Sequence, residues 1–261
     1  MTRLPKPSTV ELVDVGSDSV EKLGFFCCMS KRKSEGWQDK LAWCHQRFAE
    51  GMRLKLLGDK QRGFIEYGPG EHAWRVVEAK GYLVIHCLWV VGKSKGKGHG
   101  AALLQHCIDD ARKSKLEGVA VVTSEHPWVP SRRIFERHGF ERVDEAPPAF
   151  ELWAKRFNKR ARKPQFPTDW AARAKRFGKG FTVVTTAQCP YNADAVDGAL
   201  AAAKAHGFRT RVVKLDSQAD VQKRAPTAYG TFAMVLDGKL FSTMYLLPKD
   251  FPKRLAAFRA G

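Results

Sequence analysis

The sequence has no long hydrophobic run, no low-complexity tract and no internal repeat. No stretch approaches the roughly 18 uninterrupted apolar residues of a membrane-spanning helix. The N-terminal segment MTRLPKPSTVELVDVG lacks the apolar core of a secretory signal. Hydrophobic residues nevertheless make up 44% of the 261-residue chain, which is enough to fill a core and excludes disorder. We therefore expect a globular, cytoplasmic protein with no membrane partner.

Cysteine patterns typical of metal binding or dithiol chemistry are also missing. The six cysteines form no CxxC pair and no Cys/His quartet with zinc spacing, so we expect no metal site. A disulfide framework is not expected in a reducing compartment. Most of these cysteines lie in apolar or amphipathic segments, where a free cysteine usually packs as a small hydrophobe.

Acidic residues are scarce relative to basic ones. Lys plus Arg total 45 and Asp plus Glu total 27, which gives a formal net charge of +18. Such a charge attracts polyanions, among them nucleic acid, anionic lipid and phosphorylated cofactors such as coenzyme A. The alternative is a solvated basic surface with no dedicated partner. No basic motif rich in stacking aromatic residues accompanies the charge, so we do not expect nucleic-acid binding.

The length allows one large domain or two of ordinary size. The run NKRARKPQFPT at residues 158–168 combines basic residues with prolines and has little to bury, which predicts an exposed basic linker. We therefore expect one domain at residues 1–157 and a smaller one at residues 169–261.

Strand and helix patterns alternate along both halves, which predicts an α/β fold class. The run YLVIHCLWVV at residues 82–91 is almost wholly apolar and should be a central strand buried on both faces. In the first half we expect strands at residues 10–15, 54–57, 63–67, 74–78, 82–91, 119–123, 140–143 and 150–155, and helices at 35–50, 100–115 and 131–138. In the second half we expect strands at 181–185 and 211–214, a hairpin of strands 231–236 and 240–244, and helices at 192–206, 218–223 and 252–259.

The segment LWVVGKSKGKGHGAALL at residues 88–104 is the most informative one. A buried strand enters a turn with glycines at positions 92, 96, 98 and 100, and a helix leaves it. Glycines let backbone N–H groups converge on an anion, and the N-terminus of a helix adds partial positive charge. Together with the neighbouring lysines, this pattern predicts a diphosphate site.

Two common phosphate motifs do not fit this turn. The Walker A pattern GxxxxGK[ST] is absent, and the dinucleotide fingerprint GxGxxG is not matched. The spacing Lys95-x-x-Gly98-x-Gly100 instead resembles the pyrophosphate signature [QR]xxGx[GA] of the GNAT superfamily, with Lys95 in the Gln/Arg position. The segment RRIFERHGF at residues 132–140 is similar to the later signature of that family, in which a helix ends in a Gly-Phe pair.

The resemblance covers about residues 10–157. It implies a mixed central sheet flanked by helices, acetyl-CoA as cofactor and direct acetyl transfer to a small amine or peptide. A backbone N–H at Leu88 or Trp89 is then expected to bind the thioester carbonyl. The cofactor contacts that the resemblance implies are Leu88, Trp89, Val90, Lys95, Gly96, Lys97, Gly98, His99, Gly100, Ala101 and Phe135.

The family's usual general acid is a tyrosine in the helix before the Gly-Phe pair, and here Phe135 occupies that position. Phenylalanine has no proton to give. Three alternatives remain: another group protonates the leaving thiolate, the thiolate leaves as an anion stabilised by basic surroundings, or the chain is a regulatory CoA-binding protein without turnover.

Glu66 and His86 are the candidate catalytic acid–base residues. Glu66 lies on a strand expected to face the cleft, or it is an ordinary strand-surface carboxylate. His86 lies in an apolar strand, where a hydrogen-bonded core histidine is the alternative. Cys87 adjoins His86, and regular alternation predicts that the two side chains point to opposite faces of the sheet. Tyr67 and His126 are weaker candidates.

Arg75 is expected either to contact substrate or to lie on the surface of the strand at residues 74–78. In the second half, Cys189 follows a strand and precedes a helix, which is the position of a thioredoxin nucleophile. The motif Cys-Pro-Tyr-Asn resembles a glutaredoxin CPYC motif with Asn192 in place of the second cysteine, which excludes a two-cysteine cycle. Pro226 resembles the cis-proline of the thioredoxin family.

An acetyltransferase domain followed by this module is similar to the architecture of YoaP-type acetyltransferases. The third function class left open is therefore a monothiol redox or substrate-capture protein that uses Cys189. Neither the acyl acceptor nor the oligomeric state follows from the sequence.

Overall fold

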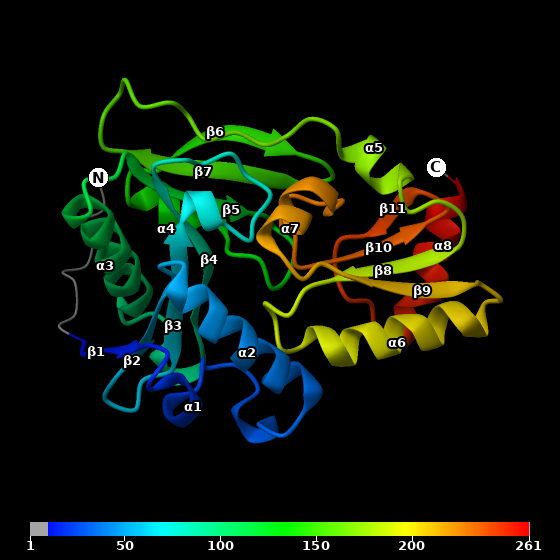
Figure 1. The fold of residues 1–261 in the computed structure, drawn as a ribbon, viewed down its shortest axis with the longest axis horizontal. Helices are drawn as coiled ribbons and strands as arrows, with labels where there is room; N and C mark the ends of the chain where they lie inside the picture. Colours follow the sequence, from blue (N-terminus) through cyan, green and yellow to red (C-terminus); the bar gives the residue numbers. More distant parts are fainter. Residues whose placement is uncertain (1–9, 261) are drawn as a thin grey trace. The chain divides into compact units, whose positions relative to one another are not determined.

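The computed structural model describes residues 10–260 (Figure 1). Residues 1–9, which include most of the N-terminal segment considered as a signal, lie outside the described residues. The chain divides into two units. The first comprises the residues up to Met29, Cys44–Ala73 and Val77–Phe166, and the second comprises Ser30–Trp43, Trp74–Val76 and the residues from Pro167 on.

The first unit is built on a seven-stranded mixed sheet with the order β1-β2-β3-β4-β5-β7-β6 (Figure 1). Only β4 and β5 pair in parallel among these neighbours of the described chain. The fold class, a mixed sheet flanked by helices, is thereby confirmed. The strands are β1 (Leu12–Val15), β2 (Arg53–Leu57), β3 (Gly63–Pro69), β4 (Tyr82–Val90), β5 (Gly118–Thr123), β6 (Glu141–Ala146) and β7 (Phe150–Arg156).

Helices α3 (His99–Lys113) and α4 (Arg132–Arg137) pack on one face of this sheet. The apolar residues of α3 recur at helical spacing, so that they form one stripe, and this stripe meets side chains of β3, β4 and β5. The α3 face of the sheet is thus defined by Ile65, Tyr67, Leu83, Ile85, Leu88, Val119, Val121 and Trp153. Two further helices are α1 (Val20–Leu23) and α2 (Glu35–Ala49), of which α2 contributes to both units.

The parallel ladder between β4 and β5 is short. Its last pair is Ile85 with Val121, although β4 runs on to Val90 and β5 to Thr123. The two strands therefore separate at their carboxyl ends, where the central strand keeps only its antiparallel neighbour β3.

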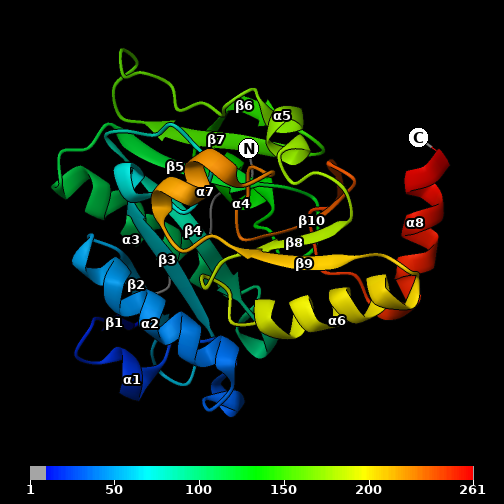
Figure 2. The ribbon, with the colours of Figure 1, turned by 45° about the vertical axis from the view of Figure 1, so that its right-hand side comes forward.

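The second unit has a four-stranded sheet with the order β11-β10-β8-β9, in which β8 and β9 are parallel and the other pairs are antiparallel. Helix α6 runs beside β8 and β9 in both views (Figures 1 and 2). The elements are α5 (Trp170–Lys175), β8 (Phe181–Thr185), α6 (Asn192–Ala205), β9 (Thr210–Lys214), α7 (Gln218–Arg224), β10 (Phe232–Leu236), β11 (Lys239–Ser242) and α8 (Phe251–Ala260). Aromatic side chains of β8, β11 and α8, led by Phe181, Phe241 and Phe251, fill its core.

Most of the expected elements are confirmed to within a few residues at their ends. The expected strand at residues 74–78 is wrong, since that segment holds only an isolated bridge between Glu78 and Gln165. The helix α5 was not expected. Among residues 10–260, no helix has the length and hydrophobicity needed to cross a membrane.

The segment at residues 158–168 is only partly the exposed linker that its composition predicts. Its basic residues are mostly exposed, but Pro164 and Phe166 are buried. The backbone of Gln165 pairs with Glu78, and the Phe166 N–H donates to Asp144 Oδ2 at 2.7 Å. Burial of Pro164 and Phe166 and these backbone hydrogen bonds hold this end of the segment to the first unit, which extends to Phe166.

Candidate active site

A β-bulge in β4 brings the candidate catalytic residues together. In the antiparallel ladder with β3, Glu66 pairs with Cys87 while Tyr67 pairs with Ile85, so His86 is an extra residue on β4. The bulge lies immediately after Ile85, where β4 also loses its parallel partner β5. The bulge therefore lies at the point where β4 and β5 begin to separate.

The bulge also changes which way the side chains point. Ile85 and Leu88 both belong to the α3 face, although three positions separate them. The two residues between them, His86 and Cys87, consequently lie on the opposite face, together with Glu66, which pairs with Cys87. The expectation that His86 and Cys87 point to opposite faces is wrong, because it assumed a regular strand.

Glu66 and His86 form a buried pair. Glu66 Oε1 lies 3.6 Å from His86 Nδ1, and the two side chains are 3% and 2% exposed. A carboxylate beside an imidazole stabilises the protonated form of the ring and fixes its orientation. Cys87 beside them is half-buried. The structure thus assembles an acid–base pair on one face of the sheet, where the sequence offered two separate candidates.

The gap between β4 and β5 suits an extended chain that carries amide groups. Beyond Ile85, the edge of β4 that faces β5 has no ladder partner among the described residues, so its backbone groups face the gap. Leu88, Trp89 and Val90 lie on this stretch, and the side chains of Leu88 and Val90 pack into the α3 core. The backbone of residues 88–90 is therefore available to a ligand that lies along the strand.

The glycine turn after β4 has the geometry of an anion cradle. Gly98 is the N-cap of α3 with φ 81° and ψ −4°, a left-handed conformation that residues with a side chain rarely adopt. The first N–H groups of a 15-residue helix follow it, at His99, Gly100 and Ala101, and such groups have no intrahelical acceptor. A Cβ at Gly100 would lie 3.1 Å from Ile134 Cδ1, so even an alanine there would require the Ile134 side chain to shift slightly.

Ser94 holds this turn in place, a role that the sequence did not reveal. The buried Ser94 Oγ accepts the Arg62 N–H at 2.8 Å and donates to Gln61 Oε1 at 3.1 Å. Around it, Lys93, Lys95 and Lys97 are exposed, as is Gly96. A hydrogen-bonded backbone turn and exposed lysine side chains are thus combined at the helix N-terminus, which fits a diphosphate.

Phe135 and Tyr67 are both packed on the α3 face. Phe135 is fully buried, and its ring lies 5.4 Å from that of Phe140 in an edge-on arrangement. Contact with a cofactor stays a prediction for Phe135. The Tyr67 hydroxyl donates to Asp110 Oδ2, and burial followed by the nearby Cys107 and Asp110 raises the pKa of Tyr67 far above its usual value. Tyr67 therefore belongs to a buried network away from Glu66.

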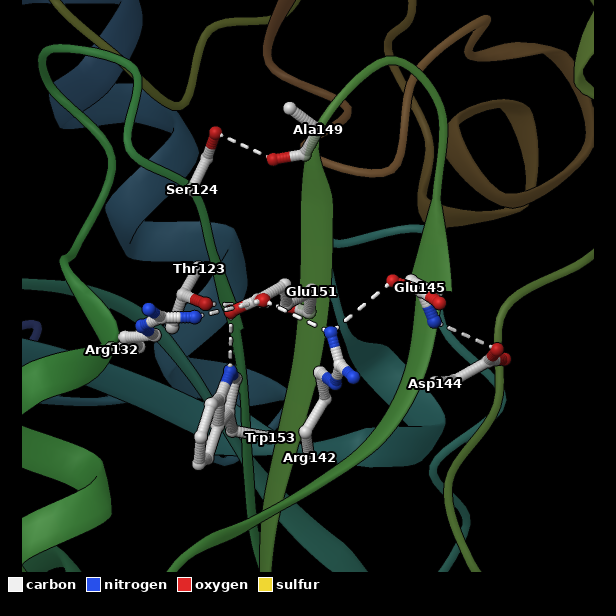
Figure 3. Close-up of polar contacts among 9 residues, drawn as sticks. All are labelled: Thr123, Ser124, Arg132, Arg142, Asp144, Glu145, Ala149, Glu151 and Trp153. Carbon is white, nitrogen blue, oxygen red and sulfur yellow. Dashed lines mark hydrogen bonds and ion pairs between the residues drawn. The ribbon is translucent and has the colours of Figure 1, made fainter.

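A cavity of about 470 Å³ opens between the end of β5, the turn from β6 to β7 and the start of α4. At its centre, Glu151 Oε2 accepts the Trp153 Nε1–H at 2.9 Å, and Glu151 Oε1 lies 3.4 Å from both Arg132 and Arg142 (Figure 3). Ser124 Oγ donates to the Ala149 carbonyl at 2.7 Å and ties β5 to the turn. The lining residues are Ser124, Glu125, Arg132, Glu145, Ala146, Pro147, Pro148, Ala149, Phe150 and Glu151.

None of these lining residues was among the sequence candidates. Glu151 lies 3.4 Å from two guanidinium groups, those of Arg132 and Arg142 (Figure 3), and the lining also holds the carboxylates of Glu125 and Glu145. His126, a weaker candidate, lies in the loop after β5 with its ring 6.2 Å from that of Phe150. Only the assembled turn from β6 to β7 reveals this cavity, since its residues lie far from Ser124 in the sequence.

In the second unit, Cys189 lies in the loop between β8 and α6 and is half-buried. Asn192, the residue in place of a second cysteine, is buried, and its Nδ2 donates to the carbonyls of Thr186 and Thr231, each at 3.0 Å. The asparagine thus locks the loop to its neighbours. Within residues 10–260 the cis peptide bond is Pro147–Pro148, so the expected cis bond before Pro226 is wrong.

Arg75 belongs to the second unit and is 2% exposed, so neither a surface position nor ready contact with a substrate is found. Its Nη1 donates to Gln188 Oε1 at 2.6 Å, and its guanidinium lies 3.8 Å from the centre of the Tyr229 ring. The adjoining Val76 N–H donates to the Ala228 carbonyl at 3.1 Å. Arg75 is therefore a buried structural cation next to the residue that precedes Cys189.

Residues 23–140 match the sequence model described as the acetyltransferase (GNAT) family. This match includes β3, β4, the bulge and the glycine turn. The chain is also 29% identical over 246 residues to a Bacillus subtilis (strain 168) protein described as uncharacterized N-acetyltransferase YoaP, and the alignment covers 93% of this chain and 97% of the relative.

Similar solved structures include an acetyltransferase from Thermus thermophilus, with 16% identity and a TM-score of 0.42 over 57% of this chain and 97% of the other. Another is the PaiA N-acetyltransferase from Thermoplasma acidophilum in complex with coenzyme A, with 13% identity and a TM-score of 0.41 over 57% of this chain and 99% of the other.

Proposed function

We propose that this N-acetyltransferase, whose residues 23–140 form an acetyltransferase domain of the GNAT family, transfers the acetyl group of acetyl-CoA to a small amine or peptide with the help of Glu66 and His86. The observation that carries the proposal is the bulge in β4. It places the 3.6 Å pair of Glu66 and His86 at the start of the gap between β4 and β5.

Acetyl-CoA, when bound, supplies a thioester whose acetyl group is ready for attack by an amine. The backbone of residues 88–90 would hold its extended arm, and the turn from Lys95 to Ala101 would hold its diphosphate. The unpaired edge of β4, the left-handed N-cap at Gly98 and the exposed lysines support this assignment. The role of Lys95 is electrostatic, since a flexible lysine acts on phosphate as a point charge.

Glu66 and His86 would manage the protons. An acceptor amine is an ammonium ion at neutral pH, and it would first lose one proton to solvent so that its nitrogen has a free electron pair. His86 would take a second proton from that nitrogen as the nitrogen joins the acetyl carbon and the sulfur leaves, and Glu66 would stabilise the resulting imidazolium. His86 would then give this second proton to the departing sulfur. This assignment needs no proton from Phe135.

The test measures thiol release from acetyl-CoA with a panel of amines. We expect Glu66→Gln and His86→Gln to lower kcat by about a hundredfold or more, while the dissociation constant for acetyl-CoA stays within about twofold. His206→Gln, on the exposed end of α6, is the matched control and should behave as wild type. Full activity of both site variants would reject the proton-transfer role, and no binding of acetyl-CoA at millimolar concentration would reject the enzyme assignment.

For the second unit we propose a thioredoxin-like accessory domain. Supporting it are the sheet order β11-β10-β8-β9, the parallel pair β8 and β9, and the position of Cys189 between β8 and α6. Since Asn192 stands in the position of the second cysteine and has no thiol, any thiol chemistry of this motif would use Cys189 alone. Iodoacetamide labelling tests that alternative: a Cys189 that reacts no faster than a model thiol at neutral pH would reject it.

A further inference from the structure

We propose that the acceptor carries a flat aromatic group, which packs on a row of aromatic side chains next to Glu66 and His86. The row consists of Phe26, Phe64, Trp89 and Trp128 and is called the aromatic row below. The inference rests on the proposed function, because it names the class of amine that reaches the same site.

The register of the sheet places the centre of the row beside the acid–base pair. Phe64 pairs with Trp89, just as Glu66 pairs with Cys87. Residues two positions apart on a strand share a face and lie about 7 Å apart. Phe64 therefore follows Glu66 on the face of the sheet opposite α3, and Trp89 lies on the same face because its neighbours Leu88 and Val90 pack on the α3 side.

Aromatic side chains from two loops extend the row on both sides. The ring of Phe26, from the segment after α1, stacks on Phe64 with centroids 4.9 Å apart and an interplanar angle of 26°. The ring of Trp128, from the loop after β5, lies 6.1 Å from Trp89 at an angle of 47°. The row thus crosses from the loop after α1 over β3 and β4 to the loop after β5, across the gap.

The two outer residues are held in an unusual backbone conformation. Phe26 has φ 77° and Trp128 has φ 70°, values that are rare for bulky side chains and cost free energy. Trp128 is also 69% exposed, so burial of its own ring does not repay that cost. A large apolar side chain that is both strained and exposed indicates a contact that is completed by a ligand.

The chemistry of the row selects the ligand. Tryptophan and phenylalanine faces bind flat apolar groups by stacking, and their negative faces also attract an ammonium ion. The protein has a formal net charge of +18, so its overall field does not draw a cation to the site. The acceptor must then be held by local contacts, and a primary amine joined to an aromatic ring by a short chain satisfies both the row and the acid–base pair.

The test compares 2-phenylethylamine with n-hexylamine as acceptors in the full-length protein. We expect wild type to use the aromatic amine with a kcat/KM about tenfold higher. Trp128→Ala should raise the KM for 2-phenylethylamine about five- to tenfold, with kcat and the KM for acetyl-CoA within about twofold of wild type. Trp128→Phe keeps a flat ring and should retain most of the preference. The control Tyr245→Ala removes an exposed ring in the second unit and should change neither constant.

A readout independent of turnover separates this inference from the proposed function. In the presence of coenzyme A, 2-phenylethylamine should alter the near-ultraviolet circular dichroism of wild type, and the change should be lost in Trp128→Ala. If no amine is acetylated but this signal appears, the proposed function fails and the aromatic site stands. Equal use of the two amines by wild type, with no effect of Trp128→Ala, overturns the inference while leaving acetyl transfer intact. Equal binding by wild type and Trp128→Ala also overturns it.

Discussion

The Nη1 atom of Arg75 donates a hydrogen bond to Gln188 Oε1 at 2.6 Å, although 113 positions separate the two residues in the chain. The same nitrogen also approaches the Tyr229 carbonyl at 3.2 Å, and Gln222 Nε2 donates to the Arg75 carbonyl at 2.6 Å. A short segment between β3 and β4 is thus fixed into the second unit by charged hydrogen bonds around one buried guanidinium.

Replacing Arg75 should destabilise the second unit strongly. Arg75→Ala leaves the Gln188 side chain and the Tyr229 carbonyl without their donor inside a buried region, which costs about 3 kcal/mol or more. Urea unfolding followed by circular dichroism measures the loss, and Arg133→Ala, at an exposed position of α4, is the control. A change of less than about 1 kcal/mol for Arg75→Ala would contradict the structural role.

Replacing Gly98 should weaken the binding of acetyl-CoA more than it weakens the fold. Gly98→Ala forces a side chain into the left-handed region at φ 81°, which costs about 1–2 kcal/mol, and it displaces the N–H groups that would meet the diphosphate. We expect a dissociation constant at least tenfold higher by calorimetry. Gly207→Ala shares a positive φ at the far end of α6 and controls for the strain alone. Equal affinities of Gly98→Ala and wild type would show that this turn does not bind the diphosphate.

Asp110 should make stability depend on pH in the acid range. Burial opposes its ionisation, but hydrogen bonds from Tyr67 and Arg53 outweigh that cost and lower the pKa of the Asp110 carboxyl. A carboxyl with a lowered pKa in the folded state stabilises the fold above its unfolded pKa of about 3.9, and this contribution is lost as the pH falls through the folded value. The difference in free energy of unfolding between wild type and Asp110→Asn should therefore shrink as the pH is lowered from about 5 to about 2. A constant difference across that window would contradict the assignment.

Acetyl-CoA should protect Cys87 from alkylation. Cys87 is half-buried on the face that carries Glu66 and His86, whereas Cys44 and Cys107 are buried. Mass spectrometry after brief iodoacetamide treatment should show slower labelling of Cys87 when acetyl-CoA is present. Cys189, in the loop after β8, provides the internal reference. Slower labelling of Cys189 with unchanged labelling of Cys87 would argue against the proposed position of the acetyl group.

The sequence predicted the elements of the first unit well because they follow simple periodicities. The apolar run of β4 and the amphipathic stripe of α3 each identify their element and its buried face. The glycine turn could also be predicted from the sequence, because a left-handed N-cap such as Gly98 favours glycine and so appears in the amino-acid sequence itself. The contact between Glu66 and His86 could not be predicted from the sequence. A bulge is a mismatch in pairing between two strands, so neither strand alone shows it as a periodic pattern.

Long-range contacts account for the other differences. Arg75 was expected either to contact substrate or to lie on the surface of a strand, and the partners that bury it, Gln188 and Tyr229, lie more than a hundred positions later. Trp128 could not be predicted as a site residue, because a single aromatic residue in a loop belongs to no periodic pattern. Its proposed role depends on its position next to Trp89, which only the fold shows. The predicted domain limits follow composition along the chain, whereas the units of the structure are assembled from separated stretches.

That assembly from separated stretches has a consequence for how the chain can be rearranged. Because Trp74–Val76 interrupts the first unit yet belongs to the second, the piece from Pro167 onward lacks residues that line its own interior. Fusing that piece to an unrelated acetyltransferase would transfer an incomplete structural unit. A fragment meant to hold the whole second unit would therefore have to include Ser30–Trp43 and Trp74–Val76 as well as the residues from Pro167 on.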